Sequence, residues 1–490
     1  MKRHKYIFVI GGVMSGVGKG ITTSSIGTIF QSKGYKVNII KADPYLNVDA
    51  GTMNPTEHGE VFVLHSGLET DQDMGNYERF LNRDAQEEDY MTSGMVYSSV
   101  IKRERELKYK GKCVEAIPHI RDEITSRIIA SAKKSKSDIS IIEIGGTVGD
   151  YQNIMFIESA RVLKLENPED VAIIMVSYLP IPGTLGEMKS KPTQNAVRQL
   201  NSYGVNVDFI IARSAVPLDV RRKEKLAISC NVPAMRIISA PDIESIYDVP
   251  ENFEKDKLSS MIEKVLYMKP KKANLANWSA FVKKTKTAKN VVQIAIVGKY
   301  FDTGDFVLSD AYVSVIEAIK FSAYAQGVKP KLIWMNSKQF EGDAKKVQAL
   351  CKEKFAGIDG ILVPGGFGET GIEGKINVIR YAREKKIPYF GLCYGMQLLV
   401  IEYARNKAKL AGAHTVEINP RTLFPVIDIM ATQKQLVKEE NFGGSMRLGG
   451  YVCVLKEKTI AQKVYEKASW TKVVKGKHQV MERHRHRYEV

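Results

Sequence analysis

The chain contains 490 residues, of which 44% are hydrophobic, and its formal net charge is +17. This length predicts two or three domains with sizeable cores, and two is the simplest number. The positive charge suggests nucleic-acid binding, but the Lys/Arg-rich runs at residues 102–110, 133–136 and 283–289 are short and interrupted. We therefore predict a solvated basic surface that attracts small polyanions such as nucleotides, with no nucleic-acid partner.

Cysteine usage and hydropathy set two further limits. The five cysteines, at positions 113, 230, 351, 393 and 453, lack the paired spacing of a metal site. An odd number of cysteines, in a chain without a recognisable signal peptide, predicts free thiols in a reducing, cytoplasmic compartment. The apolar runs are strand-sized, and none approaches the ~18 residues needed to cross a bilayer, so we expect no membrane association.

The first half of the chain alternates aliphatic runs with helical sequence. The predicted strands cover residues 6–10, 36–40, 138–144, 171–179, 207–212 and 236–239. Because these runs are apolar throughout, both faces of each strand should be buried, which is typical of a parallel sheet flanked by helices. We predict an α/β fold whose first domain, residues 1–267, is doubly wound.

A Lys-rich polar stretch then interrupts the pattern. We predict a linker over residues 268–290, because a new apolar strand begins at Val291. A second doubly wound α/β domain is expected over residues 291–490. Its predicted elements are strands at 331–335, 360–363 and 387–390, a helix at 398–403, and less regular strands at 425–430 and 446–455.

The sequence YIFVIGGVMSGVGKGITTSS, residues 6–25, reads as a strand, a glycine-rich turn and a helix start. In this arrangement backbone N–H groups and a helix N-terminus bind phosphate. The strict P-loop pattern is not met, because Val13 replaces a glycine and Gly20 replaces the hydroxyl residue that binds magnesium. Lys19 can still reach terminal phosphates, whereas a turn used only for packing would not need a lysine.

A loop without that hydroxyl requires carboxylates to hold magnesium. Glu143 lies at the end of the aliphatic run DISIIEIGG, at the sheet edge where doubly wound domains bind ligands. Asp71 and Asp73 lie in the sequence ETDQDMGNYERF. Acids at such places can equally be helix caps or surface charges, so at this point both groups are candidates only.

Eight motifs occur in order along the chain: GGVMSGVGKG, KADPYLNVDAGTMNPTEHGEVFV, ETDQDMGNYERF, EIGGTVGD, KSKPTQ, PGGFG, GLCYGMQ and ERHRHRYE. Together they resemble the CTP synthase family from residue 6 to the last residue. The resemblance implies a P-loop-like amidoligase domain that uses ATP and Mg²⁺ to phosphorylate the 4-oxygen of UTP, so that ammonia can displace the phosphate and give CTP. It also implies a class I glutamine amidotransferase domain that sends ammonia through an internal tunnel, and a homotetramer with nucleotide sites at subunit interfaces.

The resemblance assigns functional residues of the first domain by position. For ATP these are Ser15, Gly16, Val17, Gly18, the catalytic Lys19, Gly20, Ile21, Asp73, Pro241, Asp242 and Ile243. The implied magnesium ligands are Asp73 and Glu143. UTP, and CTP as an inhibitor, are assigned to Ser15, Asp150, Tyr151, Gln152, Lys189, Ser190, Lys191, Pro192, Thr193, Gln194 and Lys225. Three lysines in this set can neutralise most of the charge of a triphosphate.

Two positions depart from the family pattern. Gln152 stands where the family commonly has a glutamate, so we expect CTP feedback to differ in strength. Thr370 stands where the family usually has an arginine, and loss of that planar cation leaves activation by GTP open.

The sequence GLCYGMQ, residues 391–397, has the glycine spacing of a nucleophile elbow. A cysteine after a strand is usually a small buried hydrophobe, but the elbow spacing favours a nucleophile whose pKa is lowered by the helix N-terminus. By resemblance, Cys393 attacks the glutamine carboxamide, and the amides of Gly366 and Tyr394 stabilise the oxyanion. The implied glutamine-binding set is Gly366, Tyr394, Gly395, Met396, Gln397, Glu417 and Arg487.

The base that would serve Cys393 is not evident. In the family, a His-Pro-Glu motif beyond RHRHRYE completes the triad, whereas the histidines after Cys393 here are His414, His478, His484 and His486. We therefore expect glutamine-driven synthesis to be severely impaired in this 490-residue form, and synthesis from free ammonia to persist.

Two other classes of protein share parts of the pattern. Regulatory ATPases with a deviant phosphate loop carry a signature lysine where this chain has Met14. An enzymatically silent filament subunit would not need Lys19, Asp73 and Glu143 together. Both classes remain alternatives that an assay of UTP conversion separates.

Overall fold

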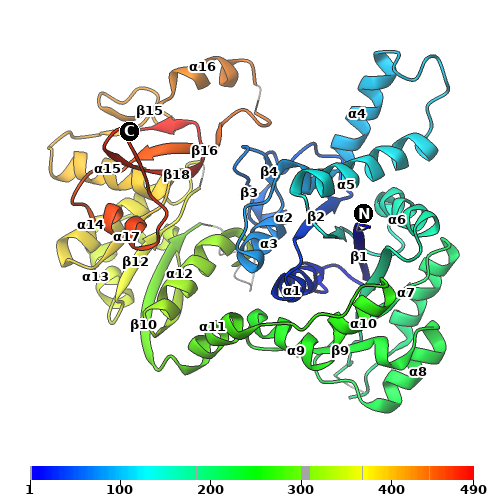
Figure 1. The fold of residues 1–490 in the computed structure, drawn as a ribbon. Coiled ribbons are helices and arrows are strands. Elements are labelled where there is room, and N and C mark those ends of the chain that lie inside the picture. The colour runs from blue at the N-terminus through cyan, green and yellow to red at the C-terminus, as the bar shows by residue number, and fades with distance from the viewer. Residues whose placement is uncertain (1–2, 184–185, 300–308, 367, 441) are drawn as a thin grey trace. The chain divides into compact units, whose positions relative to one another are not determined.

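The computed structural model describes residues 3–183, 186–299, 309–366, 368–440 and 442–490 (Figure 1). The chain divides into two compact units, the first made of Met1–Ala50 and Asp73–Val282 and the second of Gly51–Gln72 and Lys283–Val490. Residues 51–72 thus group with the second unit, although the predicted boundaries placed them in the first domain. The predicted linker, residues 268–290, includes helix α11 (Ala276–Thr287).

The first unit is built on a seven-stranded sheet with the order β5-β2-β6-β1-β7-β8-β9. Every strand pair in it is parallel, which confirms the predicted doubly wound α/β fold. The strands are β1 (Lys5–Gly12), β2 (Val37–Asp43), β5 (Tyr90–Thr92), β6 (Ile139–Ile144), β7 (Val171–Tyr178), β8 (Phe209–Ser214) and β9 (Ile237–Pro241). Because β1 has a neighbour on each side, β6 and β7, its carboxyl end lies at the point where such sheets bind ligands.

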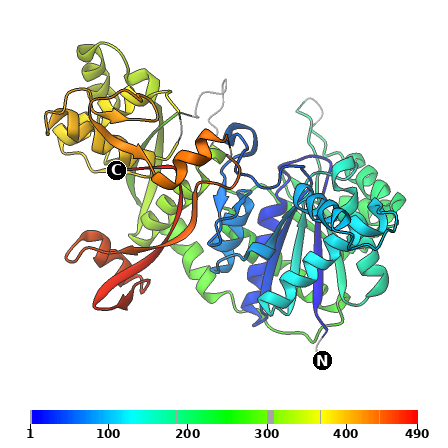
Figure 2. The same cartoon turned by 90° about the horizontal axis from the view of Figure 1, so that it is seen from above.

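Helices cover both faces of this sheet (Figures 1 and 2). One layer consists of α4 (Ser93–Arg105), α5 (Arg121–Ser135), α6 (Ile154–Glu166), α7 (Lys191–Ser202) and α8 (Val220–Cys230), whose apolar side chains share a core with the strands. The other layer contains α1 (Lys19–Ser32), α3 (Asp73–Leu81), α9 (Val249–Lys255) and α10 (Leu258–Val265). Burial on both faces explains why the strands are continuous apolar runs.

The second unit contains a four-stranded parallel sheet with the order β11-β10-β12-β13. Its strands are β10 (Asn290–Gly298), β11 (Val328–Asn336), β12 (Gly360–Val363) and β13 (Tyr389–Gly391), in agreement with the predicted runs. The helices that accompany it are α12 (Val313–Ala325), α13 (Ala344–Lys354), α14 (Ile372–Lys385) and α15 (Tyr394–Asn406). Helices α13 and α14 share one core with the strands, and α12 packs in a separate one.

Three small sheets complete the second unit. The first joins β14 (His414–Thr415), β15 (Pro425–Ile429) and β19 (Tyr488–Glu489), and the second joins β16 (Arg447–Val454), β17 (Lys472–Val474) and β18 (Lys477–His486). The third is the antiparallel pair β3 (Phe62–Val63) and β4 (Glu69–Thr70). The remaining helices are α2 (Pro55–His58), α16 (Ala431–Lys438) and α17 (Ile460–Lys467).

Other expectations from composition can be compared with the structure. All five cysteines are free thiols, as predicted. Within the described residues, every helix is too short or too polar to span a lipid bilayer.

A cavity of about 680 Å³, lined mainly by apolar side chains, lies over β10, β12 and β13 beside α12.

Candidate active site

The glycine turn after β1 places Lys19 at the start of α1. Gly16 and Gly18 have φ angles of 68° and 91°, and Gly18 is the N-cap residue of the helix. Only glycine adopts such angles without strain, so the turn depends on both residues. The Lys19 ammonium donates a hydrogen bond to the Gly146 carbonyl oxygen, 2.9 Å away, beyond the end of β6. The predicted strand, turn and lysine are therefore present.

A second lysine, Lys41 near the end of β2, forms ion pairs with the acidic groups of the site. It is the register partner of Glu143 on β6, and its Nζ donates to Glu143 Oε1 at 3.0 Å. The same Nζ donates to Asp73 Oδ2 and lies 3.7 Å from Asp43 Oδ1. Lys41 is only 4% exposed, so the three carboxylates are its charge partners inside the protein.

Helix α3 contributes two side chains to this cluster. Asp73 is its first residue and Tyr77 lies one turn later, so both project from the same face. The Tyr77 hydroxyl donates to Glu143 Oε2 at 2.5 Å. Of the two aspartates considered from the sequence, Asp73 lies against Lys41, whereas Asp71 belongs to the second unit.

Burial and opposite charge compete in this cluster. Burial raises the pKa of Glu143 and of Asp43, and the Lys41 ammonium opposes the rise in each case. Burial lowers the pKa of Lys19, which the nearby Glu143 opposes. Carboxylates that already enclose one cationic group can stabilise another cation at the same place.

Gly20 shows why the strict P-loop motif is not met. A Cβ atom at this position would clash with the carboxylate of Asp73. The space that a Ser or Thr side chain would fill is therefore taken by a carboxylate from α3. The same arrangement explains the missing hydroxyl and supplies an oxygen ligand in its place.

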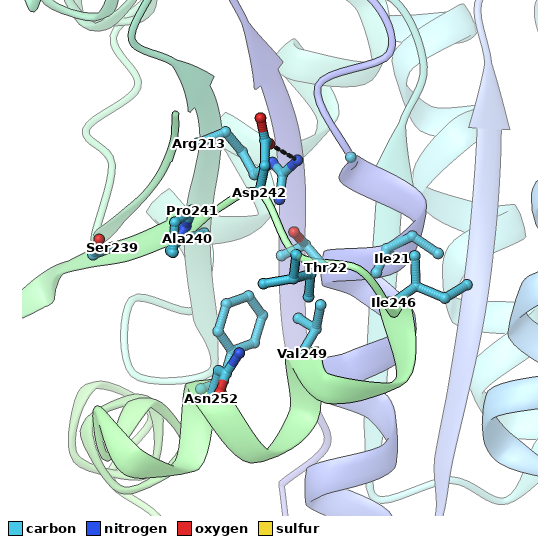
Figure 3. Close-up of a pocket in the computed structure, with 13 residues that line it drawn as sticks. Ile21, Thr22, Arg213, Ser239, Ala240, Pro241, Asp242, Ile246, Val249 and Asn252 are labelled. Atoms are coloured by element: carbon cyan, nitrogen blue, oxygen red, sulfur yellow. Dashed lines mark hydrogen bonds and ion pairs between the residues drawn. The ribbon is translucent and has the colours of Figure 1, made fainter. Parts of the chain in front are cut away.

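A cavity of about 240 Å³ lies beside the glycine turn (Figure 3). Gly18, Ile21 and Thr22 line one side of it, and the segment Ser239–Ile243 lines another. The Arg213 guanidinium donates to Asp242 Oδ1 at 2.9 Å. Further lining residues are Ile246, Val249, Asn252 and Phe253. The predicted residues Pro241, Asp242 and Ile243 thus lie at a cavity next to the lysine-bearing loop.

In the second unit, Cys393 occupies a sharp turn between β13 and α15. Its backbone has φ 49° and ψ −104°, and it caps the helix that follows. A Cβ on Gly391 would lie 2.5 Å from the carbonyl carbon of Gly395, and a Cβ on Gly395 would clash with the Val363 carbonyl oxygen. Both glycines are therefore required by close backbone approach, as expected for a nucleophile elbow.

The expected lowering of the Cys393 pKa is not what the structure shows. Cys393 is exposed at the surface, yet the protein atoms around its sulfur desolvate it and raise the thiol pKa, which outweighs the Tyr394 N–H and the Arg485 charge that both lower it. The carboxylate of Glu417 adds to the rise. The sequence argument considered the helix N-terminus but not desolvation, which favours the neutral thiol.

Comparison with known proteins identifies the family. Residues 5–268 match the family described as CTP synthase N-terminus, and residues 307–490 match glutamine amidotransferase class-I. A CTP synthase from Thermococcus kodakarensis is 45% identical over 487 residues, which cover 99% of this chain and 86% of that protein. The chain belongs to the CTP synthase family.

A second relative agrees with this assignment, and one solved structure is similar in part. A CTP synthase from Pyrococcus abyssi is 46% identical over 487 residues, again covering 99% of this chain and 86% of that protein. A solved Trypanosoma brucei CTPS glutaminase domain with bound acivicin is 34% identical, with a TM-score of 0.34, and the match covers 41% of this chain and 68% of that one. As CTP synthases are ligases that form a carbon–nitrogen bond and use ATP, this chain is such an enzyme with both domains present.

The residues assigned to UTP and CTP lie in exposed or partly exposed segments of the first unit. Asp150 accepts a hydrogen bond from the Thr147 amide at 2.7 Å, and Tyr151 is 93% exposed. The Lys189 ammonium lies 2.6 Å from Glu187, and Lys191 begins α7. Gln152 and Lys225 are also exposed, and Pro192 is partly exposed. Thr193 and Gln194 are buried, and the Gln194 side chain donates a hydrogen bond to Ser190 Oγ at 3.2 Å.

Four of the residues assigned to glutamine, Tyr394, Gly395, Met396 and Gln397, form the first turn of the helix that follows the thiol turn. Gly365 approaches Cys393, since a Cβ on it would lie 3.5 Å from the cysteine Cβ. Glu417 accepts from the Gly368 amide at 3.3 Å, and burial raises its pKa. Phe367, in the PGGFG motif, lies outside the described residues.

Arg487 is buried in a set of hydrogen bonds. Its guanidinium donates to Gln433 Oε1 at 2.6 Å, to the Phe442 carbonyl at 3.0 Å and to Ser445 Oγ at 2.9 Å. These contacts fix the arginine that the resemblance assigns to the substrate carboxylate. Gln397, from the same predicted set, donates to the Tyr488 carbonyl at 3.0 Å.

Sequence reasoning missed three residues of the first unit's site. Lys41 and Asp43 lie in the quoted motif beginning KADPYLN, and Tyr77 lies in ETDQDMGNYERF. A lysine inside an otherwise apolar strand that pairs with the strand carrying Glu143 was a usable signal, because a buried charge needs a partner. Tyr77 was predictable only after α3 and its first residue had been placed.

Proposed function

We propose that the first unit phosphorylates the 4-oxygen of UTP with ATP and that ammonia then displaces the phosphate to form CTP. The observation that carries this proposal is the convergence of Asp73, Glu143 and Lys41 beside the glycine turn that bears Lys19. Lys19 would stabilise the charge on the transferred phosphoryl group, because a fixed cation at that place acts in a largely water-free site.

The ATP would lie along the turn and the adjacent cavity. Its phosphates would accept hydrogen bonds from the backbone amides of residues 15–21 at the N-terminus of α1. Its base would enter the cavity lined by Pro241–Ile243, where the Arg213–Asp242 pair borders the opening (Figure 3). The mixed apolar and polar lining suits a flat heteroaromatic ring.

Asp73 and Glu143 would hold Mg²⁺. Mg²⁺ commonly binds one or two carboxylates together with substrate phosphates and water, so two protein ligands are sufficient. The fit is supported by Lys41, whose ammonium already lies between these carboxylates. When bound, the ion would neutralise phosphate charge during transfer.

The pyrimidine nucleotide would be held by the lysines at 189, 191 and 225, with Asp150–Gln152 nearby in the assigned set. Lys191 and Lys225 are exposed and Lys189 is partly exposed and paired with Glu187, so a triphosphate could reach all three, and the product CTP would compete for the same place. The proposal includes a cytoplasmic location, which the five free thiols favour. It also includes assembly into a homotetramer. Activation by GTP stays open.

In the second unit, Cys393 would be the nucleophile that hydrolyses glutamine. Its sulfur forms a bond to the side-chain carbonyl carbon, the C–N bond breaks, and the nitrogen leaves as ammonia with the thiol's proton. Water then cleaves the thioester, which releases glutamate and restores the thiol. The amides of Gly366 and Tyr394 would stabilise the oxyanion, and Glu417 and Arg487 would orient the substrate.

We further propose that synthesis from free ammonia is faster than synthesis from glutamine where Cys393 has only the described histidines as possible bases. Desolvation raises the pKa of the Cys393 thiol, and these histidines have other neighbours. His478 lies 2.9 Å from Glu466, His484 lies 2.9 Å from His486, and the His414 ring nitrogen accepts from the Thr415 amide.

The direct test is an absorbance assay of UTP-to-CTP conversion with ATP and Mg²⁺. We expect CTP with ammonium chloride, much less with glutamine, and none with Lys19→Met. A native chain that makes no CTP from ammonium chloride contradicts the synthetase proposal. Equal rates from the two nitrogen donors contradict the ammonia preference alone.

A further inference from the structure

The segment that links β2 to α3, residues 51–72, packs within the second unit against β16 and β18. The Gly450 amide donates to the His65 carbonyl at 3.0 Å, and the Arg483 guanidinium donates to the Val63 carbonyl at 3.2 Å. Gly449 and Gly67 approach so closely that a Cβ on Gly449 would lie 2.6 Å from the Gly67 nitrogen. This segment is therefore fixed by backbone contacts that tolerate little change.

Glu69, on β4 of this segment, forms an ion pair with Arg485 of β18. The Arg485 Nε donates to Glu69 Oε1 at 2.7 Å, and its Nη2 donates to the Gly51 carbonyl at 3.3 Å. Glu69 is 1% exposed, and a Cβ on Gly51 would clash with its other oxygen. Two acceptors from residues 51–72 thus fix the plane of one guanidinium, with little solvent to weaken the charge pair.

Arg485 is the second-last residue of β18. Arg487 follows in the bend between β18 and β19 and has a different set of hydrogen-bond partners. Tyr488, directly after, accepts a hydrogen bond from Gln397 in the first turn of α15, the helix that Cys393 caps. The chain that follows β18 is thus attached to the helix that begins at the thiol turn, and Arg485 lies close enough to Cys393 for its charge to act on the sulfur.

We propose that Glu69 is a positioning residue that holds the Arg485 guanidinium near Cys393, so that Arg485 stabilises the thiolate that attacks glutamine. This inference rests on the proposed role of Cys393. It assigns to a segment from the amidoligase half of the sequence a task in the glutamine-hydrolysing half.

The electrostatics of the thiol agree with this role. The groups that act on Cys393 are the Tyr394 amide and Arg485, which lower its pKa, and Glu417, which raises it together with desolvation. Arg485 is thus the cationic side chain that opposes the desolvation of the sulfur. Its effect depends on where the guanidinium lies, because the interaction of two charges falls with their separation.

The test follows the alkylation of Cys393 by iodoacetamide as a function of pH, read by mass spectrometry of its peptide. In this reaction the thiolate sulfur bonds to the methylene carbon and iodide leaves, so the rate reports the thiolate fraction without glutamine turnover. Arg485→Met should move the profile upward by roughly one pH unit. Glu69→Ala should shift it in the same direction, because the guanidinium loses its anchor.

Glu69→Gln separates positioning from charge. The amide oxygen still accepts from Arg485 Nε but carries no negative charge, so the profile should stay in place or move down. An upward shift as large as that of Arg485→Met overturns the proposal. This variant also decides the question if Glu69→Ala does not fold.

A double-mutant cycle adds a second criterion. Glu69→Ala should have no further effect on the profile once Arg485 is Met, because it acts through that side chain. Additive shifts, or no shift with Glu69→Ala alone, contradict the proposal. Two controls are used. Arg483→Met, on the same strand, should leave the Cys393 profile unchanged, and the exposed thiol of Cys113 should keep its own profile in all variants. Glutamine hydrolysis measured separately tests the role of Cys393, and its absence would leave the alkylation result intact.

Discussion

The turns that follow β1 and β13 both join a strand to a helix, but the buried charges near them differ. Near the first, the buried Lys41 lies among the carboxylates of Asp43, Asp73 and Glu143. Near the second, Lys375 of α14 is 0% exposed, its Nζ has no hydrogen-bond partner in the part of the chain that the structure describes, and it lies 5.6 Å from the centre of the Tyr394 ring.

This difference separates two uses of a strand–glycine–helix turn. Acids that surround a buried lysine keep it charged and create a place for ions, which suits phosphate chemistry. Without acids, burial lowers the pKa of Lys375 to about 7, with a smaller contribution from Lys299. Within the described residues, Lys375 is thus a buried cation without the neighbouring carboxylates that surround Lys41. Four predictions test this contrast.

The largest effect is expected from Asp73→Asn. Loss of one carboxylate from the Lys41 cluster should lower CTP formation by about a thousandfold with either nitrogen donor, because magnesium and phosphate binding both depend on it. The measurement is initial rate against Mg²⁺ concentration with ammonium chloride. Asp71→Asn is the matched control, and an equal loss in both variants would place the metal elsewhere.

The next effect concerns stability and pH. Because the Lys375 pKa falls from 10.5 to about 7 on folding, the unfolded state binds more protons between these values, and stability should rise with pH across that window. Lys375→Met should remove this dependence and stabilise the protein at pH 7 by up to about 4 kcal/mol. Urea midpoints at several pH values measure it. Lys385→Met, an exposed change on the same helix, should retain the native slope.

A smaller loss is expected when the strict P-loop hydroxyl is restored by Gly20→Ser. The new side chain would displace the Asp73 carboxylate, so activity should fall roughly tenfold to a hundredfold. The melting temperature of each variant is also measured, and rates are compared at a temperature well below both values, so that unfolding does not account for the difference. An unchanged or higher rate would mean that the hydroxyl can serve as a ligand and that Asp73 is not needed at that place.

The smallest effect is expected from Tyr77→Phe. Removing the hydroxyl that donates to Glu143 should raise the Mg²⁺ concentration needed for half the maximal rate about tenfold. The rate at saturating Mg²⁺ should be nearly unchanged. Tyr6→Phe, in β1 of the same sheet, is the control. A fall in the saturated rate without a change in Mg²⁺ dependence would show that Tyr77 does not support the metal ligand.

Sequence patterns predicted what depends on neighbouring residues. Six strands of the first sheet overlap the predicted aliphatic runs, whereas the short edge strand β5 was not predicted, and the glycine turns at Lys19 and Cys393 are present. The pairing of Lys41 with Glu143, about a hundred residues apart, depends on strand order, which local patterns do not determine. The pKa of the Cys393 thiol is raised, contrary to the sequence-based expectation, because desolvation depends on the folded surroundings of the sulfur, which local patterns do not determine.

The packing of residues 51–72 has a practical consequence for dissecting the enzyme. The chain crosses from one unit to the other after residues 50, 72 and 282, so a single cut near residue 282 leaves two covalent connections. A glutaminase fragment cloned from residue 283 onward would lack the strand pair that anchors Arg485. To obtain that unit as an independent module, one would have to graft the missing segment back, for example by circular permutation.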